Sequence, residues 1–177
     1  MRAPPRLQTA RLDLRPPVAE DFAATMALLA EPDTARFLGR SDRADHFLRF
    51  CRGAGSWLLY GYGTFILRPR GSGRVIGNCG IFHSWRGLGA DFDDLPEAGW
   101  ILGVDHVGQG LAREAMEAVL EWFDAAHSRR VMCMIEQGND RSMRLAGRLG
   151  FMPMREAALP DGAGAMLLER NAAGVGS

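Results

Sequence analysis

The chain has 177 residues, of which 47% are hydrophobic and 24% are charged, and these are ordinary values for a globular protein with a substantial core. Its 21 basic side chains, all of them arginine, balance 21 acidic ones, so the formal net charge is zero. This balance argues against a dedicated nucleic-acid-binding protein. The length predicts one domain over residues 1–177, with flexible ends at 1–6 and 171–177.

The cysteine pattern favours a reducing compartment. Cys51, Cys79 and Cys133 are an odd number without the spacing of a metal site, and the last two lie in apolar runs that predict buried free thiols. No secretory signal and no apolar run of membrane-spanning length is visible. We therefore expect a cytoplasmic protein with no metal ion, no membrane contact and no nucleic-acid partner.

The first half of the chain predicts two strands that form a hairpin, preceded by a strand and two helices. The expected elements, in order, are strand Leu12–Arg15, helices Glu20–Ala30 and Asp45–Cys51, and the hairpin strands Gly61–Arg68 and Arg74–His83. The side chains expected to face inward from the two helices are Phe22, Met26 and Leu29, and Phe47 and Phe50.

The second half alternates strands with helices after a loop that carries three aspartates. The expected elements are loop Ser84–Pro96, strand Glu97–Val104, a helix to His127, strand Val131–Ile135, a helix after Asn139, and strands Phe151–Ala157 and Ala165–Glu169. Along the long helix, the predicted buried stripe is Leu111, Ala115, Ala118, Val119, Trp122 and Ala126. The loop aspartates Asp91, Asp93 and Asp94 hint at a cationic ligand nearby.

A glycine turn, Val107–Arg113, lies between the predicted strand at Glu97–Val104 and the long helix. The first N–H groups of a helix have no intrahelical partner and carry partial positive charge. Because Gly108 and Gly110 have no side chain, a phosphate could approach this backbone closely. The turn matches neither a Walker loop nor a dinucleotide fingerprint, and a glycine-rich loop without a ligand is the alternative.

A second segment, Val131–Phe151, carries a strand, a helix start and a helix end. Asn139 suits an N-cap, since its side-chain oxygen can accept a hydrogen bond one turn into the helix. Met143, Ala146 and Leu149 then share one helical face, and Gly150 suits the left-handed position that ends the helix.

Together the two segments resemble the GNAT superfamily of N-acetyltransferases. The family's turn is matched at Gly110 and Ala112, and its downstream pattern at Ile135-Glu136, Asn139, Ser142 and Gly150-Phe151. The opening, Thr9-Ala10-Arg11-Leu12-Asp13-Leu14-Arg15, resembles the branch that holds the ribosomal-protein N-terminal (alanine/serine) acetyltransferases. The chain departs from the family at Val107, where Gln, Arg or Trp is usual, and at Ala146, where many members have a catalytic tyrosine.

The resemblance implies an α/β fold of one GNAT domain, with a mixed, mostly antiparallel central sheet of about six to seven strands flanked by helices. In this fold the sheet splays between its fourth and fifth strands, here Glu97–Val104 and Val131–Ile135, and acetyl-CoA enters there as co-substrate. The implied cofactor contacts are Leu102, Gly103 and Val104 for the pantetheine amides, Gly108, Gln109, Gly110, Leu111, Ala112 and Arg113 for the diphosphate, and Asn139.

Direct transfer of acetyl to an amine needs a proton acceptor and a stabilised thiolate. Glu97 is the first candidate for the base, with a structural carboxylate as the alternative, and Asp93, Asp94 and His83 are weaker candidates. Glu136, which matches the family motif, would orient the amine or serve a structural role rather than act as the base. Ser142 could donate a hydrogen bond to the sulfur or could simply cap its helix, as Asn139 could.

The acceptor is a primary amine, either a protein N-terminus or a small molecule, and a homodimer is an open possibility that the resemblance raises. Aromatic residues in segments that could border the acceptor pocket are Phe37, Trp57, Tyr60, Tyr62, Phe82 and Trp85. Two other functions stay open at this stage. One is a non-catalytic acyl-CoA-binding sensor or interaction module, and the other is an unrelated nucleotide-binding domain that uses the same helix start.

Overall fold

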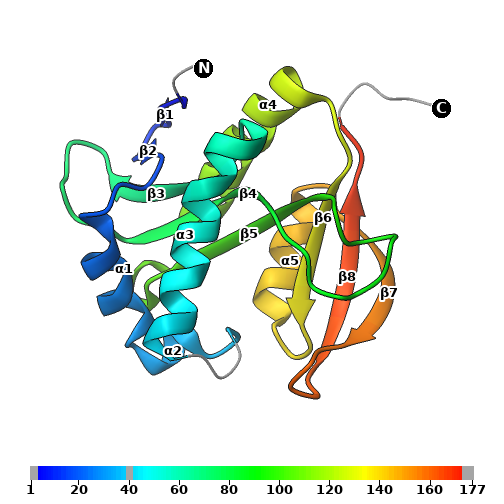
Figure 1. The fold of residues 1–177 in the computed structure, drawn as a ribbon. Helices are drawn as coiled ribbons and strands as arrows, with labels where there is room; N and C mark the ends of the chain where they lie inside the picture. Colours follow the sequence, from blue (N-terminus) through cyan, green and yellow to red (C-terminus); the bar gives the residue numbers. More distant parts are fainter. Residues whose placement is uncertain (1–3, 39–41, 173–177) are drawn as a thin grey trace.

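The computed structural model describes residues 4–38 and 42–172, and within them the sheet has eight strands in the order β1-β2-β3-β4-β5-β6-β8-β7 (Figure 1). The strands are β1 Leu7–Gln8, β2 Leu12–Arg15, β3 Thr64–Pro69, β4 Gly77–His83, β5 Pro96–Leu102, β6 Val131–Glu136, β7 Met152–Ala158 and β8 Gly164–Arg170. The predicted fold class is confirmed, and the sheet exceeds the predicted six to seven strands because the two-residue β1 was not expected.

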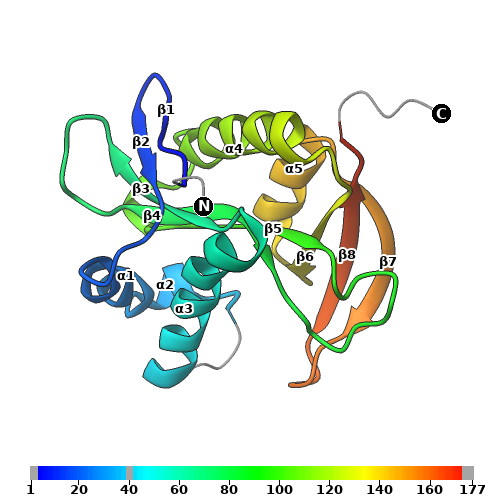
Figure 2. The same ribbon diagram turned by 45° about the horizontal axis from the view of Figure 1, so that its top comes forward.

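Within the described residues, five α-helices cover the sheet. They are α1 Asp21–Leu29, α2 Pro32–Ala35, α3 Arg43–Tyr60, α4 Leu111–His127 and α5 Asp140–Arg148. Figure 2 shows α1, α2 and α3 on one face of the sheet, and α4 and α5 on the other. The two faces of the sheet are therefore covered by different helices.

The central sheet opens between β5 and β6. All other neighbouring strands are antiparallel, whereas these two run parallel and pair only at Glu97 with Met132 and at Ala98 with Cys133. Beyond Ala98, β5 keeps its β4 partner as far as Leu102 but has no partner on the β6 side. This is the splay that the resemblance predicted, and it leaves a free backbone edge in the interior of the sheet.

The long helix α4 is confirmed at its predicted ends, but its buried stripe lies further round the helix. Leu111, Ala115 and Val119 are buried as expected, together with Met116, Leu120 and Phe123, whereas Ala126 is exposed and Trp122 only half-buried. Residues 115, 116 and 118–120 are all apolar, so a 3.6-residue period alone does not fix the centre of the buried stripe. Packing against the sheet decides it.

Helix α3 runs for 18 residues, where the sequence predicted a short helix at Asp45–Cys51. The two glycines in its second half weakened that prediction. The structure gives Gly53 a packing role, since a Cβ there would lie 2.3 Å from the Thr64 side-chain oxygen. Phe47, expected to be inward, is 50% exposed, while Phe50 lines a cavity.

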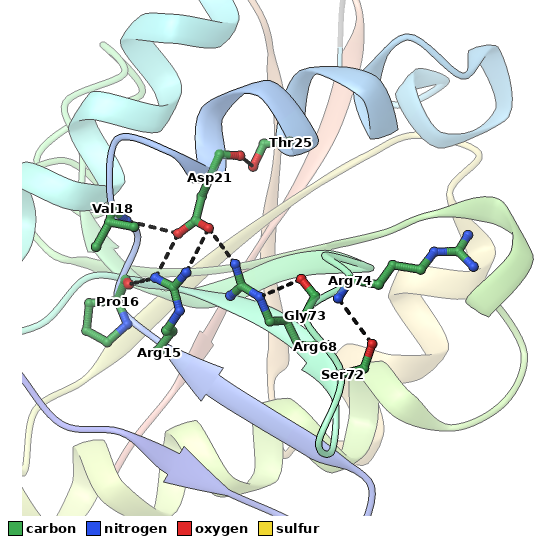
Figure 3. A network of polar contacts seen from close by, with 9 residues as sticks. All are labelled: Arg15, Pro16, Val18, Asp21, Thr25, Arg68, Ser72, Gly73 and Arg74. Carbon is green, nitrogen blue, oxygen red and sulfur yellow. Dashed lines mark hydrogen bonds and ion pairs between the residues drawn. The ribbon is translucent and has the colours of Figure 1, made fainter.

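Helix α1 is held to the sheet by a buried carboxylate. The Asp21 side chain is only 3% exposed and accepts hydrogen bonds from Arg15 at 2.9 Å, from Arg68 at 2.5 Å and from the Val18 N–H at 3.0 Å (Figure 3). The buried face of this helix is therefore Asp21, Thr25 and Leu29. The prediction is confirmed for Leu29, whereas Phe22 and Met26 are only half-buried because an ion pair, not an apolar stripe, anchors the helix.

Part of the two predicted flexible ends, residues 1–3 and 173–177, lies outside the described residues. Residues 4–6 and 171–172 are neither helix nor strand, and Ala172 is buried. No helix in the part of the chain that the structure describes is long and apolar enough to cross a membrane.

Candidate active site

The glycine turn starts α4 with bare backbone. Gly108 and Gly110 have φ of 82° and 76°, a left-handed conformation that favours glycine, and Gly110 is the N-cap. A Cβ at Gly108 would meet nothing within 4 Å, and one at Gly110 would meet only the Arg11 guanidinium at 3.6 Å. The outer side of the turn is therefore open rather than filled by neighbouring side chains.

The first helical hydrogen bond in α4 runs from the Glu114 N–H to the Gly110 carbonyl, at 3.1 Å. The N–H groups of Leu111, Ala112 and Arg113 come before it, so they have no intrahelical acceptor. These are the donors that the sequence predicted for a diphosphate, and the structure gathers them at one open end of the helix. The Arg113 side chain itself pairs with Glu117 at 2.7 Å.

The N-terminal hairpin braces this turn, which the sequence did not predict. Arg11 donates to the Gln109 carbonyl at 2.9 Å and to Glu114 at 2.6 Å, and Thr9 donates to Glu114 at 2.5 Å. Burial opposes the negative charge of Glu114, but these hydrogen bonds outweigh it and lower the pKa of the carboxyl. Thr9 and Arg11 belong to the opening motif Thr9–Arg15, so the family resemblance already contains the residues that make these contacts.

The backbone after β5 is more occupied than predicted. The N–H groups of Gly103 and Val104 donate to the Ile76 carbonyl and the Thr34 hydroxyl, and their carbonyls accept from His106 and Val107 in a short 3-10 turn. Gln109 also turns back, donating to the Asp105 carbonyl at 2.8 Å. The edge of β5 without a β6 partner is Gly99–Leu102, so of the predicted contact segment Leu102–Val104 only Leu102 lies on this free edge.

Helix α5 begins at the gap. Asn139 accepts from the Ser142 N–H at 3.1 Å, which confirms the predicted cap. The Ser142 hydroxyl oxygen accepts from the indole N–H of Trp100 at 3.2 Å, so a β5 side chain reaches α5 across the gap. Among the described residues no acceptor takes the Ser142 hydroxyl hydrogen, which leaves it free to donate.

A cavity of about 400 Å³ lies on the other side of the splay, between the sheet and α1–α3. It takes residues from both splayed strands and from the loop after β4. Its lining includes Glu97, Trp100 and Met134 from β5 and β6, Glu136 at the end of β6, Arg49 and Arg52 from α3, and Trp85 and Arg86 from the loop. The cavity therefore borders the unpaired segment of β5 and the end of β6 that lie on either side of the gap.

Glu97, the predicted base, lines this cavity but is 2% exposed and fully engaged. Arg86 donates to both of its oxygens at 2.7 Å, and Ser84 donates to one of them. Burial disfavours the charge of Arg86, but Glu97 outweighs that effect and raises the pKa of the guanidinium. Glu97 would have to release these donors before accepting a proton, a geometry that favours the structural alternative.

The loop aspartates do not line the cavity. Asp91 pairs with Arg155 at 2.8 Å, the Asp93 side chain accepts from backbone N–H groups of Arg86 and Gly89, and Asp94 pairs with His83 at 2.9 Å. The expectation of an acidic acceptor channel built from them was therefore wrong. These carboxylates fold the loop between β4 and β5 instead.

Half of the aromatic residues expected near an acceptor pocket line this cavity. Phe37, Phe82 and Trp85 line the cavity, whereas Trp57 and Tyr62 belong to the core. Tyr60 is 41% exposed and stacks on His83 at 3.9 Å. His83, one of the weaker candidates for the base, also meets the Tyr62 hydroxyl at 3.0 Å and is a packed side chain.

The cysteines are where the sequence placed them. Cys79 and Cys133 are buried, and burial raises the pKa of both thiols, which makes them unreactive. Cys51 is exposed on α3. Within residues 4–38 and 42–172 no group of three His, Cys, Asp or Glu residues could hold a metal ion.

This geometry defines a class of α/β protein. In it the sheet is splayed, a helix starts at an open glycine turn on one side of the gap, and a cavity lies on the other. The family model described as the acetyltransferase (GNAT) domain matches residues 11–152. This chain belongs to the GNAT acetyltransferase family.

Known relatives agree with this assignment. A GnaT-family acetyltransferase structure from Bordetella pertussis is 38% identical, with a TM-score of 0.84 over 94% of this chain and 99% of that one. An acetyltransferase from Agrobacterium tumefaciens is 27% identical, with a TM-score of 0.80 over 94% of each chain. The uncharacterized protein YkkB of Bacillus subtilis is 28% identical over 85% of this chain and 87% of its own length.

More distant structures share the fold. One is the ribosomal-protein-S5-alanine acetyltransferase from Vibrio fischeri, 14% identical with a TM-score of 0.75 over 98% of this chain and all of that one. Another is yncA from Salmonella typhimurium, solved with its cofactor acetyl-CoA, 18% identical with a TM-score of 0.68 over 94% of this chain and 96% of that one.

Proposed function

We propose that this protein is an acetyl-CoA-dependent N-acetyltransferase that transfers the acetyl group directly to a primary amine. The observation that carries the proposal is the open turn at Gly108–Gly110, which places unpaired N–H donors beside the gap between β5 and β6. Family membership supports acyl transfer, and acetyl-CoA in the yncA structure agrees with the choice of co-substrate.

The residues present fit the two polar parts of coenzyme A. N–H groups of Leu111–Arg113 would hold the diphosphate at the positive end of α4. The free edge Gly99–Leu102 of β5 would pair with the pantetheine amides like an added strand. Acetyl-CoA supplies an activated thioester, and the gap lets its acetyl group reach the cavity where an amine would lie.

In the reaction a C–N bond forms between amine and acetyl carbon, the C–S bond breaks, and coenzyme A leaves as a thiol or thiolate. The amine must lose a proton. Glu136 lines the cavity at the end of β6 and forms no ion pair with any residue that the structure describes, so it would accept this proton directly or through water. Glu97 stays the alternative base, at the cost of its bond to Arg86.

Ser142 would stabilise the leaving sulfur. Its oxygen already accepts from Trp100, which orients the hydroxyl, and its hydrogen would donate to the thiolate. Ala146 is buried at the position where many relatives have a tyrosine, and the two tyrosines of the chain, Tyr60 and Tyr62, both contact His83 instead. Positioning of the two reactants would supply much of the rate, on the order of 7–11 kcal/mol.

Two measurements test the proposal. Titration calorimetry should show acetyl-CoA binding at micromolar concentrations, and a thiol assay should show acetyl-CoA-dependent release of coenzyme A with a primary amine. A protein that binds acetyl-CoA and acetylates no amine in a broad panel would instead be the acyl-CoA-binding module, which the altered Val107 and Ala146 positions favour. Absence of binding would contradict both.

A further inference from the structure

The α3 side of the cavity carries two positive charges without a carboxylate partner. Arg49 and Arg52 lie one helical turn apart and both line the cavity. Arg49 donates to the Leu38 carbonyl at 3.2 Å, and Arg52 lies over the Phe82 ring at 4.9 Å. Neither forms an ion pair with any residue in 4–38 or 42–172, and the buried Nε of Arg52 has no hydrogen-bond partner there.

The surroundings make these charges costly without an anion. Burial lowers the pKa of both guanidinium groups, and the positive charge of Arg86 lowers it further. Asp45 and Glu97 counteract this at Arg49, and Glu97 does so at Arg52. Asp45 is bonded to the Asp42 N–H, and the oxygens of Glu97 to Arg86 and Ser84. Arginine stays protonated in proteins, so an oxygen of an anionic ligand would stabilise guanidinium groups that are half-buried and have no ion-pair partner.

The same cavity also has acidic lining residues. Glu136 ends β6, and Asp161 lies in the turn between β7 and β8. Neither carboxylate forms an ion pair within the described part of the chain. Other lining residues are aromatic, with Phe37, Phe82 and Trp85 among them. A molecule that fills this cavity would therefore meet carboxylates and guanidinium groups together with apolar surface.

The two arginines lie close to the proposed place of acetyl transfer. Phe82, which Arg52 covers, pairs with Glu97 on β5, and its ring lies against Gly99, where a Cβ would approach to 3.0 Å. Gly99 is the first residue of β5 without a β6 partner, so it marks the start of the gap. With strands about 4.8 Å apart, the separation between guanidinium and gap is on the order of 5–10 Å.

We propose that the acceptor is a small amine that carries a carboxylate or phosphate group a few bonds from its nitrogen, together with an apolar body. Arg49 and Arg52 would bind the acid group, Glu136 would face the amine, and the aromatic walls would hold the body. A cavity of about 400 Å³ suits a ligand of this size. This inference rests on the proposed acetyltransferase function and narrows its substrate class.

Matched acceptors test the charge requirement. L-phenylalanine and 1-amino-2-phenylethylphosphonate carry the acid group, while phenethylamine and L-phenylalaninamide keep the body and the amine without it. The kcat/KM for release of coenzyme A should be about tenfold to a hundredfold higher with an acid-bearing probe than with the neutral ones. Whether the carboxylate or the phosphonate is preferred identifies the type of acid.

Variants test which residues are responsible. R49Q and R52Q should each raise KM about tenfold for the acid-bearing probe while leaving kcat and the acetyl-CoA affinity unchanged. Their rates with phenethylamine should not fall. The matched control is R43Q, since Arg43 is also on α3 and also lies over a ring, that of Phe22, but outside this cavity. It should behave like the wild type with every probe.

Other results would overturn the inference. Equal or better turnover of phenethylamine, or of a peptide N-terminus without an acid group, would do so while leaving the acetyltransferase function standing. The same holds if acetyl-CoA binds but no acid-bearing probe reacts or binds to the acetyl-CoA complex. If acetyl-CoA itself fails to bind, the proposed function fails as well, which separates the two failures.

Discussion

The two sides of the β5–β6 gap differ in the polar groups that they offer, which are main-chain groups on one side and side chains on the other. On the α4 side the proposed recognition groups are backbone N–H donors in a turn that glycine makes possible. On the α3 side they are side chains brought together from helices, loops and strands, both splayed strands among them. Backbone donors suit a ligand common to a family, while side chains can change with each substrate, so in our proposal the first side holds the co-substrate and the second selects the acceptor.

The largest expected effect concerns the anchor of the α1–α3 side. Replacing Asp21 by Asn removes the carboxylate that Arg15 and Arg68 share and leaves both guanidinium groups unmatched, one of them well buried. The free energy of unfolding should fall by about 3–5 kcal/mol, measured by urea denaturation. The exposed Asp33→Asn change on α2 is the control and should be nearly neutral.

The same variant also separates the two sides of the gap. Because α4 lies on the opposite face of the sheet, acetyl-CoA affinity of folded Asp21→Asn protein should stay within about twofold of the wild type. A large loss of affinity at temperatures where the protein is folded would show that the two sides are not independent.

Gly110→Val tests the backbone side. Gly110 has φ of 76°, which a β-branched residue adopts only with strain, and the new side chain would project at the diphosphate donors. Acetyl-CoA affinity should fall about a hundredfold or more, close to 2.7 kcal/mol by calorimetry. Gly71→Val, at φ of 71° in the β3–β4 turn, brings the same kind of strain far from the site and should leave the affinity intact.

Two carboxylate variants compare the candidate bases. Glu136→Gln should lower kcat about a hundredfold with little change in melting temperature, because Glu136 has no ion pair among the described residues. Glu97→Gln should mainly destabilise the protein, since it leaves Arg86 half-buried without its partner. A stable Glu97→Gln protein with the larger kcat loss would return the base to Glu97.

The smallest expected effect is on how the free energy of unfolding depends on pH through Glu114, which Thr9 and Arg11 contact. The folded-state pKa of Glu114 is lowered, so its contribution is fully present above the unfolded value, near 4.5, and is lost as the pH falls through the folded value. Glu114→Gln should cost about 1 kcal/mol at pH 7 and flatten the stability curve below pH 4.5. Parallel curves for the variant and the wild type would show that the brace contributes nothing.

The sequence predicted the backbone side well and the acceptor side poorly, for a physical reason. A strand, a positive-φ glycine turn and a helix are local, so Val107–Arg113 and the cap at Asn139 could be recognised from neighbouring residues. The pairing of Glu97 with Arg86, the brace from Arg11 to Glu114 and the Arg49–Arg52 pair on a long α3 all depend on tertiary packing. Composition and periodicity carry little information about such contacts.

The central claim is that the peptide donors of the α4 turn bind the diphosphate of coenzyme A. The most direct measurement compares the binding of acetyl-CoA with that of S-acetylpantetheine, which has the same thioester arm but no diphosphate. We predict that the wild-type protein binds acetyl-CoA about a hundredfold or more tightly than S-acetylpantetheine, and that Gly110→Val abolishes most of this difference. Equal affinities of the wild type for the two compounds would contradict it.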